Sequence, residues 1–206
     1  MMPYVCIDED VEHEIIVKKS QFICALKIAE DLETAVQVVA DIKKKHYNAA
    51  HNCSAMLIGQ DFARCSDDGE PQGTAGVPML EVLKHSGLTN IVAVVTRYFG
   101  GILLGTGGLA RAYSKSVGEA LLLARKVEYM PADIFEFDIE YADYGKLQSI
   151  AGEFGAGVHA NFLQKVAASV IIKKENSASF MKKSKDAFLG AEVCKITGEC
   201  TIKKMV

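Results

Sequence analysis

The sequence predicts a two-domain protein of the α+β class, with domains at residues 1–130 and 131–206. Strand and helix patterns are interspersed along all 206 residues, and half of the residues are hydrophobic, which is enough for two small cores. The charge balance changes at Pro131, because 13 basic residues face 16 acidic ones before it and ten lysines balance ten acidic residues after it. All four arginines lie before Pro131. Since arginine suits phosphate contacts better than lysine, the first domain is the candidate for specific recognition.

The first domain is expected to contain four strands and three helices. The strands are expected at 12–18, 22–28, 53–58 and 91–95, and the helices at 32–45, 78–85 and 109–124. The segment 91–95 is wholly apolar, which is typical of a central strand covered on both faces. Asp31 is in position to cap the first helix and Pro78 to start the second. The polar segment 59–74 is expected to form a loop.

The second domain has a simpler pattern of alternating strands and helices. Strands are expected at 135–141, 158–163, 166–172 and 192–203, and helices at 143–154 and 177–188. The resulting order, βαββαβ, is that of a split-βαβ, ferredoxin-like domain. This architecture occurs with many functions and does not by itself indicate one.

Composition excludes several classes of protein. The net charge is −3, so any nucleic-acid contact must come from a local basic patch. The N-terminus lacks the pattern of a signal peptide and no apolar stretch approaches a membrane span, so we expect a cytoplasmic protein with no membrane partner. The six cysteines form no Cys-x-x-Cys pair, so we expect reduced, buried thiols rather than metal ligands or disulfides.

The glycine-rich run 97–108, RYFGGILLGTGG, lies between the apolar strand at 91–95 and the helix at 109–124. A strand, glycine-rich turn and helix in this order aim backbone N–H groups and a helix N-terminus at an anion. The candidate ligand- or nucleic-acid-binding residues are Arg97, Tyr98, Phe99, Gly100, Gly101, Gly105, Gly107, Gly108, Arg111 and Tyr113. The arginines would contact phosphate, and the aromatic rings at 98 and 99 would stack on bases. The alternative is a tight connection whose glycines only allow close packing.

A second group of candidates surrounds the acidic loop 64–76. These rim residues are His51, Arg64, Asp67, Asp68, Glu70 and Thr74. Three carboxylates within four residues suit Mg²⁺ binding or acid–base chemistry, but the same residue types build turns that cap a helix and pair with arginines. We favour the turn, and expect no metal, no cofactor and no catalytic residue. His51 is expected to make a polar contact with this loop.

The motifs in the first domain resemble those of the YigZ/IMPACT family. They are AHNC at 50–53, SDDGEP at 66–71, TAG at 74–76, RYFGG at 97–101 and RAYS at 111–114. The two-domain length is similar to that of the bacterial branch. Val77 stands where many relatives are expected to carry a basic residue, which removes one anion contact.

The resemblance implies a fold and a function. The first domain is expected to be similar to domain IV of elongation factor G and to a ribosomal-protein domain, with a left-handed βαβ unit, and the second domain to domain V of that factor. A non-enzymatic protein that binds RNA or the ribosome and modulates translation is implied. The alternatives are a magnesium-dependent, phosphate-handling enzyme and a protein-interaction module of a stress-response pathway. The oligomeric state is left open.

Overall fold

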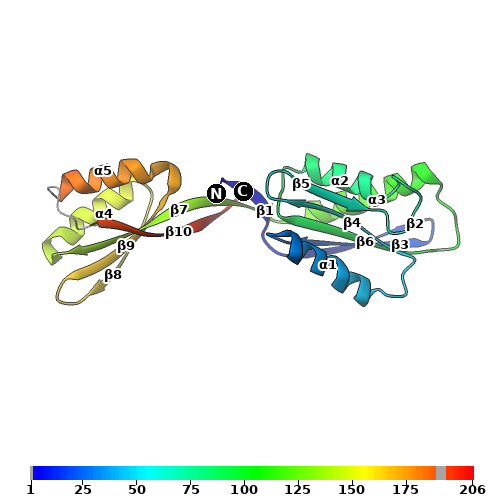
Figure 1. The fold of residues 1–206 in the computed structure, drawn as a ribbon, viewed down its shortest axis with the longest axis horizontal. Coiled ribbons are helices and arrows are strands. Elements are labelled where there is room, and N and C mark those ends of the chain that lie inside the picture. The colour runs from blue at the N-terminus through cyan, green and yellow to red at the C-terminus, as the bar shows by residue number, and fades with distance from the viewer. Residues whose placement is uncertain (1, 189–193) are drawn as a thin grey trace. The chain divides into compact units, whose positions relative to one another are not determined.

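The chain forms two compact units in the computed structural model, which describes residues 2–188 and 194–206 (Figure 1). The N-terminal unit consists of Tyr4–Glu128 with Met205–Val206, and the C-terminal unit is made mainly of Tyr129–Lys204. Strand β7 (Lys126–Ile139) passes from the first unit into the second. Pro131, expected at a domain boundary, therefore lies within a continuous strand, which a proline tolerates where its N–H is not needed in the ladder.

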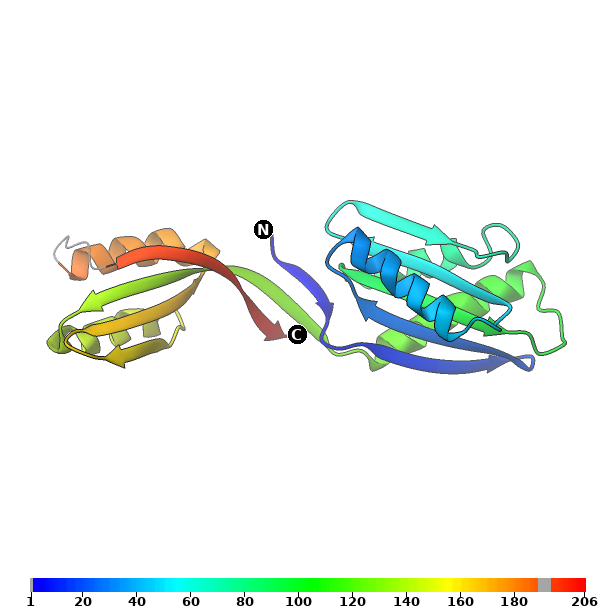
Figure 2. The same cartoon turned by 60° about the horizontal axis from the view of Figure 1, so that its bottom comes forward.

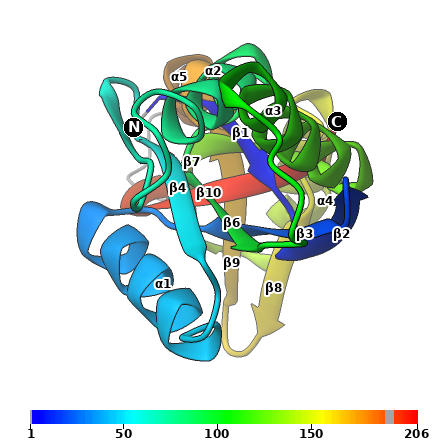
Figure 3. The same ribbon diagram turned by 90° about the vertical axis from the view of Figure 1, so that its right-hand side faces the viewer.

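The N-terminal unit has an antiparallel sheet with the order β2-β3-β6-β4-β5, and a further strand, β1, pairs with β7. Its strands are β1 (Tyr4–Ile7), β2 (Val11–Val17), β3 (Ser20–Ile28), β4 (His51–Ile58), β5 (Phe62–Ser66) and β6 (Ile91–Tyr98). Its helices are α1 (Leu32–Lys45), α2 (Gly76–His85) and α3 (Thr106–Leu123). Helix α1 covers one face of this sheet, and α2 and α3 cover the other (Figure 3).

Strand β6 is the centre of the sheet and is buried on both faces, which confirms the expectation for 91–95. Successive side chains of a strand point to opposite faces. Val92 and Val94 lie in the core under α1 together with Met56 and Ile42. The side chains of Ala93, Val95 and Arg97 consequently point toward α2 and α3. This alternation decides where the residues of the glycine-rich run are directed.

Two expectations for this unit are wrong and one is confirmed in detail. The segment 59–74 is not wholly a loop, because it contains β5, an edge strand whose exposed residues give no apolar alternation. Helix α2 begins at Gly76 rather than at Pro78, which falls in its first turn. Asp31 caps α1 as expected, since the backbone N–H of Thr34 donates to Asp31 Oδ1 at 2.7 Å.

The C-terminal unit has the predicted βαββαβ order. Its elements are β7, α4 (Tyr144–Glu153), β8 (Val158–Phe162), β9 (Val166–Lys173), α5 (Ser177–Ala187) and β10 (Cys194–Met205). The sheet order is β7-β9-β8, with β10 beside β7. Phe135 of β7 packs against Phe180 of α5 with ring centroids 4.8 Å apart, in a core that α4 also joins. The strand expected at 192–203 includes two residues outside the described part of the chain.

The structure confirms a mixed α+β protein, and the order of strands and helices differs between the two units. None of the helices in the described ranges combines the length and apolar character that crossing a membrane requires.

Candidate functional site

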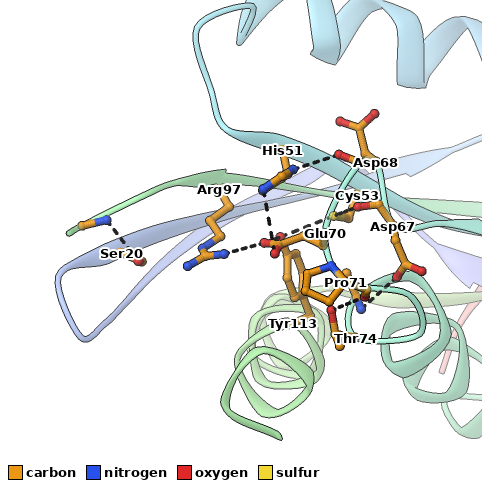
Figure 4. Close-up of polar contacts among 12 residues, drawn as sticks. Ser20, His51, Cys53, Asp67, Asp68, Glu70, Pro71, Thr74, Arg97 and Tyr113 are labelled. Atoms are coloured by element: carbon orange, nitrogen blue, oxygen red, sulfur yellow. Dashed lines mark hydrogen bonds and ion pairs between the residues drawn. The ribbon is translucent and has the colours of Figure 1, made fainter. Parts of the chain in front are cut away.

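The acidic loop between β5 and α2 is held in place by its own carboxylates (Figure 4). Asp67 accepts hydrogen bonds from the backbone N–H groups of Gly73, Ala75 and Gly76 at 2.8 to 3.0 Å. Burial opposes ionisation of Asp67, but these three donors outweigh it and keep its pKa below the ordinary value. Asp67 thus accepts hydrogen bonds from backbone N–H groups at the start of α2. It lies eight residues before the N-cap position, Ala75, so the usual sequence pattern of a helix cap does not reveal this role.

Asp68 ties the same loop to β4 and α1. It accepts a hydrogen bond from the backbone N–H of Asn52 at 2.6 Å and forms an ion pair with Lys43 at 2.5 Å. His51 Nδ1 lies 2.9 Å from the carbonyl oxygen of Asp68, and because a carbonyl only accepts, Nδ1 carries the proton. The expected polar contact between His51 and this loop is confirmed.

Glu70 is the centre of a largely buried polar group, which we call the Glu70 network: Glu70, Arg97, Tyr113 and the partly exposed His51. Arg97 Nη1 donates to Glu70 Oε1 at 2.6 Å and the Tyr113 hydroxyl donates to the same oxygen at 2.7 Å. His51 Nε2 lies 3.8 Å from the other oxygen. The side chains of Glu70 and Arg97 are 2% and 7% exposed. The predicted pairing of this loop with an arginine is therefore confirmed, and the pair is buried.

These contacts decide what the acidic loop can do chemically. The three carboxylates point to three different sets of protein donors rather than to one shared point (Figure 4). Among the described residues, no group of three His, Cys, Asp or Glu side chains is placed to hold a metal ion. Thr74, also expected at the rim, donates its hydroxyl to the carbonyl of Pro71 at 2.6 Å. In this structure the carboxylates of the acidic loop hold the loop against β4, α2 and Arg97.

Cys53 lies beside the Glu70 network but has the character of a core thiol. Its sulfur is fully buried, 2.9 Å from the carbonyl oxygen of Asp67 and 3.3 Å from the Tyr113 hydroxyl. Burial raises the pKa of the Cys53 thiol to about 12. Burial also raises the pKa of Tyr113. A thiol that stays protonated is a poor nucleophile, so this part of the site offers no activated cysteine.

The aromatic pair of the glycine-rich run is divided between the two faces of the sheet. Phe99 is 52% exposed, and its ring lies 5.6 Å from the Arg97 guanidinium carbon, which is also 5.5 Å from the ring of Phe22. Tyr98 instead interacts on the side of α1, where its hydroxyl lies 3.0 Å from His46 Nδ1 and donates to Asn48 at 3.3 Å. Phe99 is thus the aromatic ring fixed at the surface beside Arg97.

The loop after Phe99 rests directly on the turn between β2 and β3. The backbone N–H of Gly100 donates to Ser20 Oγ at 3.1 Å, and a Cβ on Gly100 would lie 2.0 Å from the carbonyl carbon of Lys19. Lys18 and Lys19 form this two-residue turn with positive φ angles of 46° and 65°. Such turns normally use asparagine and glycine, so a pair of lysines carries a conformational cost.

A basic hollow of about 230 Å³ follows at the start of α3, and we call it the Arg111 hollow. It is lined by Val17, Lys18, Leu104, Gly108, Arg111, Ala112 and Lys115. Gly105, with a φ of 72°, is the N-cap residue of α3, and no side-chain capping hydrogen bond is found there among the described residues. Lys115 is also 3.6 Å from Glu119. Lys18, Arg111 and Lys115 therefore line one concave surface together with Gly108 of the first turn of α3, and this basic surface at a helix N-terminus suits an anion.

The predicted site residues are thus divided by the structure. Arg97, Tyr113, Glu70 and His51 form the buried network, whereas Gly108 and Arg111 border the hollow. Arg97 is placed differently from the expected surface contact, since its side chain is buried and paired with Glu70. Arg64 lies elsewhere, on β5.

Lys18 and Lys19 were not among the predicted site residues, and Lys18 was expected only as the last residue of the strand at 12–18. A signal was present in the sequence. The two lysines are the two turn residues between β2 and β3, where the tightest hairpin connection requires positive φ at both positions. Residue types that do not favour that conformation indicate that the side chains serve another purpose there.

Comparison with known proteins agrees with the motifs of the first unit. Residues 18–121 match the Impact N-terminal domain. The chain is 49% identical over 148 residues to the IMPACT family member YvyE of Bacillus subtilis, covering 71% of this chain and 68% of that protein. It is 36% identical over 180 residues to the IMPACT family member YigZ of Escherichia coli, covering 85% of this chain and 88% of that protein. The chain belongs to the IMPACT family.

Membership of the IMPACT family confirms the resemblance drawn from the motifs. A solved crystal structure of a protein described as hypothetical is 32% identical, with a TM-score of 0.65, over 95% of this chain and 97% of the other. The likeness to that structure therefore extends over both units. The segment matched to the Impact N-terminal domain, 18–121, begins at Lys18 and includes the Glu70 network and every residue of the Arg111 hollow except Val17.

Proposed function

We propose that this IMPACT family protein is a non-enzymatic, RNA-binding protein that acts on translation, and that it holds RNA phosphates at the Arg111 hollow. The observation that carries the proposal is the convergence of Lys18, Arg111 and Lys115 on one hollow beside the uncapped start of α3. Arg111 has no hydrogen bond or ion pair to another described residue, in contrast to Arg97. An exposed guanidinium beside the N-terminus of a helix matches the chemistry of a phosphate group.

Phe99 supplies the second element of this proposal. Arg97 is fixed by Glu70, and the guanidinium lies near the Phe99 ring at a distance typical of a cation–π contact. Phe99 is thereby held half-exposed instead of collapsing into the core. Gly100, the next residue, rests on the turn that carries Lys18 and Lys19. A nucleotide whose base stacks on Phe99 would place its phosphate near this lysine turn.

The link to translation is part of the proposal and rests on the family. The likeness of the two units to domains IV and V of elongation factor G, which the family resemblance implies, favours an RNA of the ribosome as the target. Cytoplasmic localisation belongs to the same proposal. The acidic loop gives no support to the alternative of a magnesium-dependent enzyme, because Asp67, Asp68 and Glu70 already accept hydrogen bonds from protein donors.

The first test measures binding of a labelled RNA hairpin and a labelled oligouridine to the full chain by fluorescence anisotropy. Arg111→Gln and Lys18→Gln are each expected to weaken binding of both RNAs by about fivefold to tenfold, because each removes a phosphate contact. Arg125→Gln is the matched control, since Arg125 is 59% exposed and pairs with Glu9 away from the hollow. Equal losses in all three variants, or no binding by the parent protein, would contradict the proposal.

A second test separates stacking from charge. Phe99→Ala is expected to weaken binding of oligouridine by at least about fivefold while leaving duplex RNA unaffected, because base stacking contributes about 1–3 kcal/mol per base. Phe162→Ala is the control, since Phe162 is 53% exposed on β8 of the C-terminal unit. If Phe99→Ala leaves the affinity for oligouridine unchanged, Phe99 is not a stacking platform. The phosphate contacts would then have to be tested alone with the charge variants.

A further inference from the structure

Strand β5 has an unpaired edge at the side of the sheet opposite to the Arg111 hollow. The sheet order β2-β3-β6-β4-β5 places β5 at one edge and β2, which leads into the lysine turn, at the other. Figure 2 shows β5 as an outermost strand, and within the described residues it pairs with β4 alone. Its outer backbone N–H and C=O groups are therefore in position to pair with another strand.

The surface beside this edge is a groove of about 260 Å³ between α1 and β5. Its apolar lining is formed by Val36, Val39, Ala40 and Met56. Val36 is 47% exposed. Two further large apolar side chains on the same helix and strand, Leu32 of α1 and Phe62 of β5, are 42% and 39% exposed. An apolar groove next to an open strand edge is the arrangement in which strand addition gains both hydrogen bonds and side-chain burial.

The charge of the groove identifies the kind of partner. Arg64 lies directly across from Met56 in the β4–β5 register, so its side chain is on the face that α1 covers. It makes no hydrogen bond or ion pair with another described residue. Lys43 lines the groove on the side of α1 and also forms an ion pair with Asp68. Of the described residues that line the groove, two are cations and none is acidic, which favours an acidic occupant.

A second copy of the chain fits this edge poorly. In antiparallel self-pairing, the register that uses all five residues of β5 is centred on Arg64 and places the two arginines opposite each other. Like charges in directly opposed positions destabilise a pair of strands. Arg64 thus discourages self-association while leaving the edge open to a strand with a carboxylate at the opposed position.

We propose that an extended, acidic segment of a partner protein adds to β5 as a further strand. An acidic side chain of the segment pairs with Arg64, and its apolar side chains cover Phe62 and enter the groove past the small side chain of Ser66 toward Val36. This surface lies away from the Arg111 hollow, so the inference does not depend on RNA binding there.

The test uses the full chain and two labelled peptides, the acidic TVTETVT and the basic TVTKTVT. Because every second side chain of a strand shares a face, each peptide can place its central charge opposite Arg64 and its two valines opposite Phe62 and Ser66. The acidic peptide is expected to bind and to slow amide hydrogen exchange within 62–66. Arg64→Glu is expected to weaken the acidic peptide by about tenfold and to favour the basic one, because the charge opposite the added strand is reversed. Lys44→Glu is the matched control on α1, since Lys44 does not line the groove.

A second variant, Val36→Glu, places a charge in the groove wall and is expected to weaken the acidic peptide without affecting the sheet edge itself. The proposal is overturned if the two peptides bind equally, if Arg64→Glu has no effect, or if exchange within 62–66 is unchanged on binding. It is also overturned if sedimentation shows self-association that Arg64→Glu changes, or if Arg64→Glu weakens RNA as much as Arg111→Gln does. The occupant would then be a second copy or a nucleic acid.

Discussion

The Glu70 network and the Arg111 hollow place two arginines of the N-terminal unit in opposite environments. Arg97 is 7% exposed and has its charge neutralised by Glu70, whereas Arg111 is exposed at the edge of a hollow that it shares with Lys18. The two arginines therefore have different roles. One arginine fixes the acidic loop and the ring of Phe99, and the other remains available to an anion.

The buried pair should give the largest effect on stability. Glu70→Ala leaves the Arg97 charge buried without its partner, which is expected to lower the free energy of unfolding by about 3–5 kcal/mol. Urea denaturation of the full chain measures this loss. Glu153→Ala, which removes the exposed ion pair between Glu153 and Lys183, is expected to leave stability nearly unchanged. Similar losses for the two variants would contradict the distinction between buried and exposed charge.

Gly100 should give the next largest effect, because the loop and the lysine turn are in backbone contact there. Gly100→Ala is expected to cost about 1–3 kcal/mol or more, since its Cβ would overlap the Lys19 backbone. Gly101→Ala is the control: its φ is 80° but no atom lies within 4 Å of the added Cβ, so strain acts there without overlap. Equal losses would show that backbone conformation, and not close approach, is the constraint at Gly100.

Asp67 should give a smaller and pH-dependent effect. Asp67→Ala is expected to cost about 1 kcal/mol at neutral pH, the usual contribution of a helix-capping carboxylate. Because the pKa of Asp67 is lower in the folded chain than in the unfolded one, its contribution is present above about pH 4 and is lost as the pH falls through the folded pKa. The difference in stability between parent and variant should therefore shrink in acid. A difference that is constant from neutral to acidic pH would contradict this assignment.

Much of the fold followed from local patterns, and the exceptions have physical reasons. The central strand 91–95 and the capping by Asp31 depend on residues close in sequence, and both are confirmed. Strand β5 was missed because an exposed edge strand has no apolar alternation. The whole segment 59–74 was therefore expected to be a loop, which is correct only for the part that follows β5.

The candidate site was less predictable because its decisive contacts are distant in sequence. The sequence suggested that acidic residues of the loop pair with arginines. It did not indicate that Glu70 forms its ion pair with Arg97 and that Arg111 stays exposed. The pairing of Glu70 with Arg97 depends on the alternation of side chains along β6, which directs Arg97 to the face covered by α2 and α3. Glu70 and Tyr113 meet Arg97 on that face. The contribution of Lys18 depends on a hairpin turn that meets α3 only in the folded unit.

The contrast between the buried, paired Arg97 and the exposed, anion-binding Arg111 is tested most directly by the salt dependence of RNA binding. The parent chain is compared with the double variant Lys18→Gln, Arg111→Gln. The double variant is expected to unfold at the parent's urea midpoint, since both side chains are exposed. Its plot of log affinity against log salt should be shallower by about 1.4–1.8, the loss of two phosphate contacts. An unchanged slope, with the parent's stability retained, would show that the Arg111 hollow does not bind RNA phosphates.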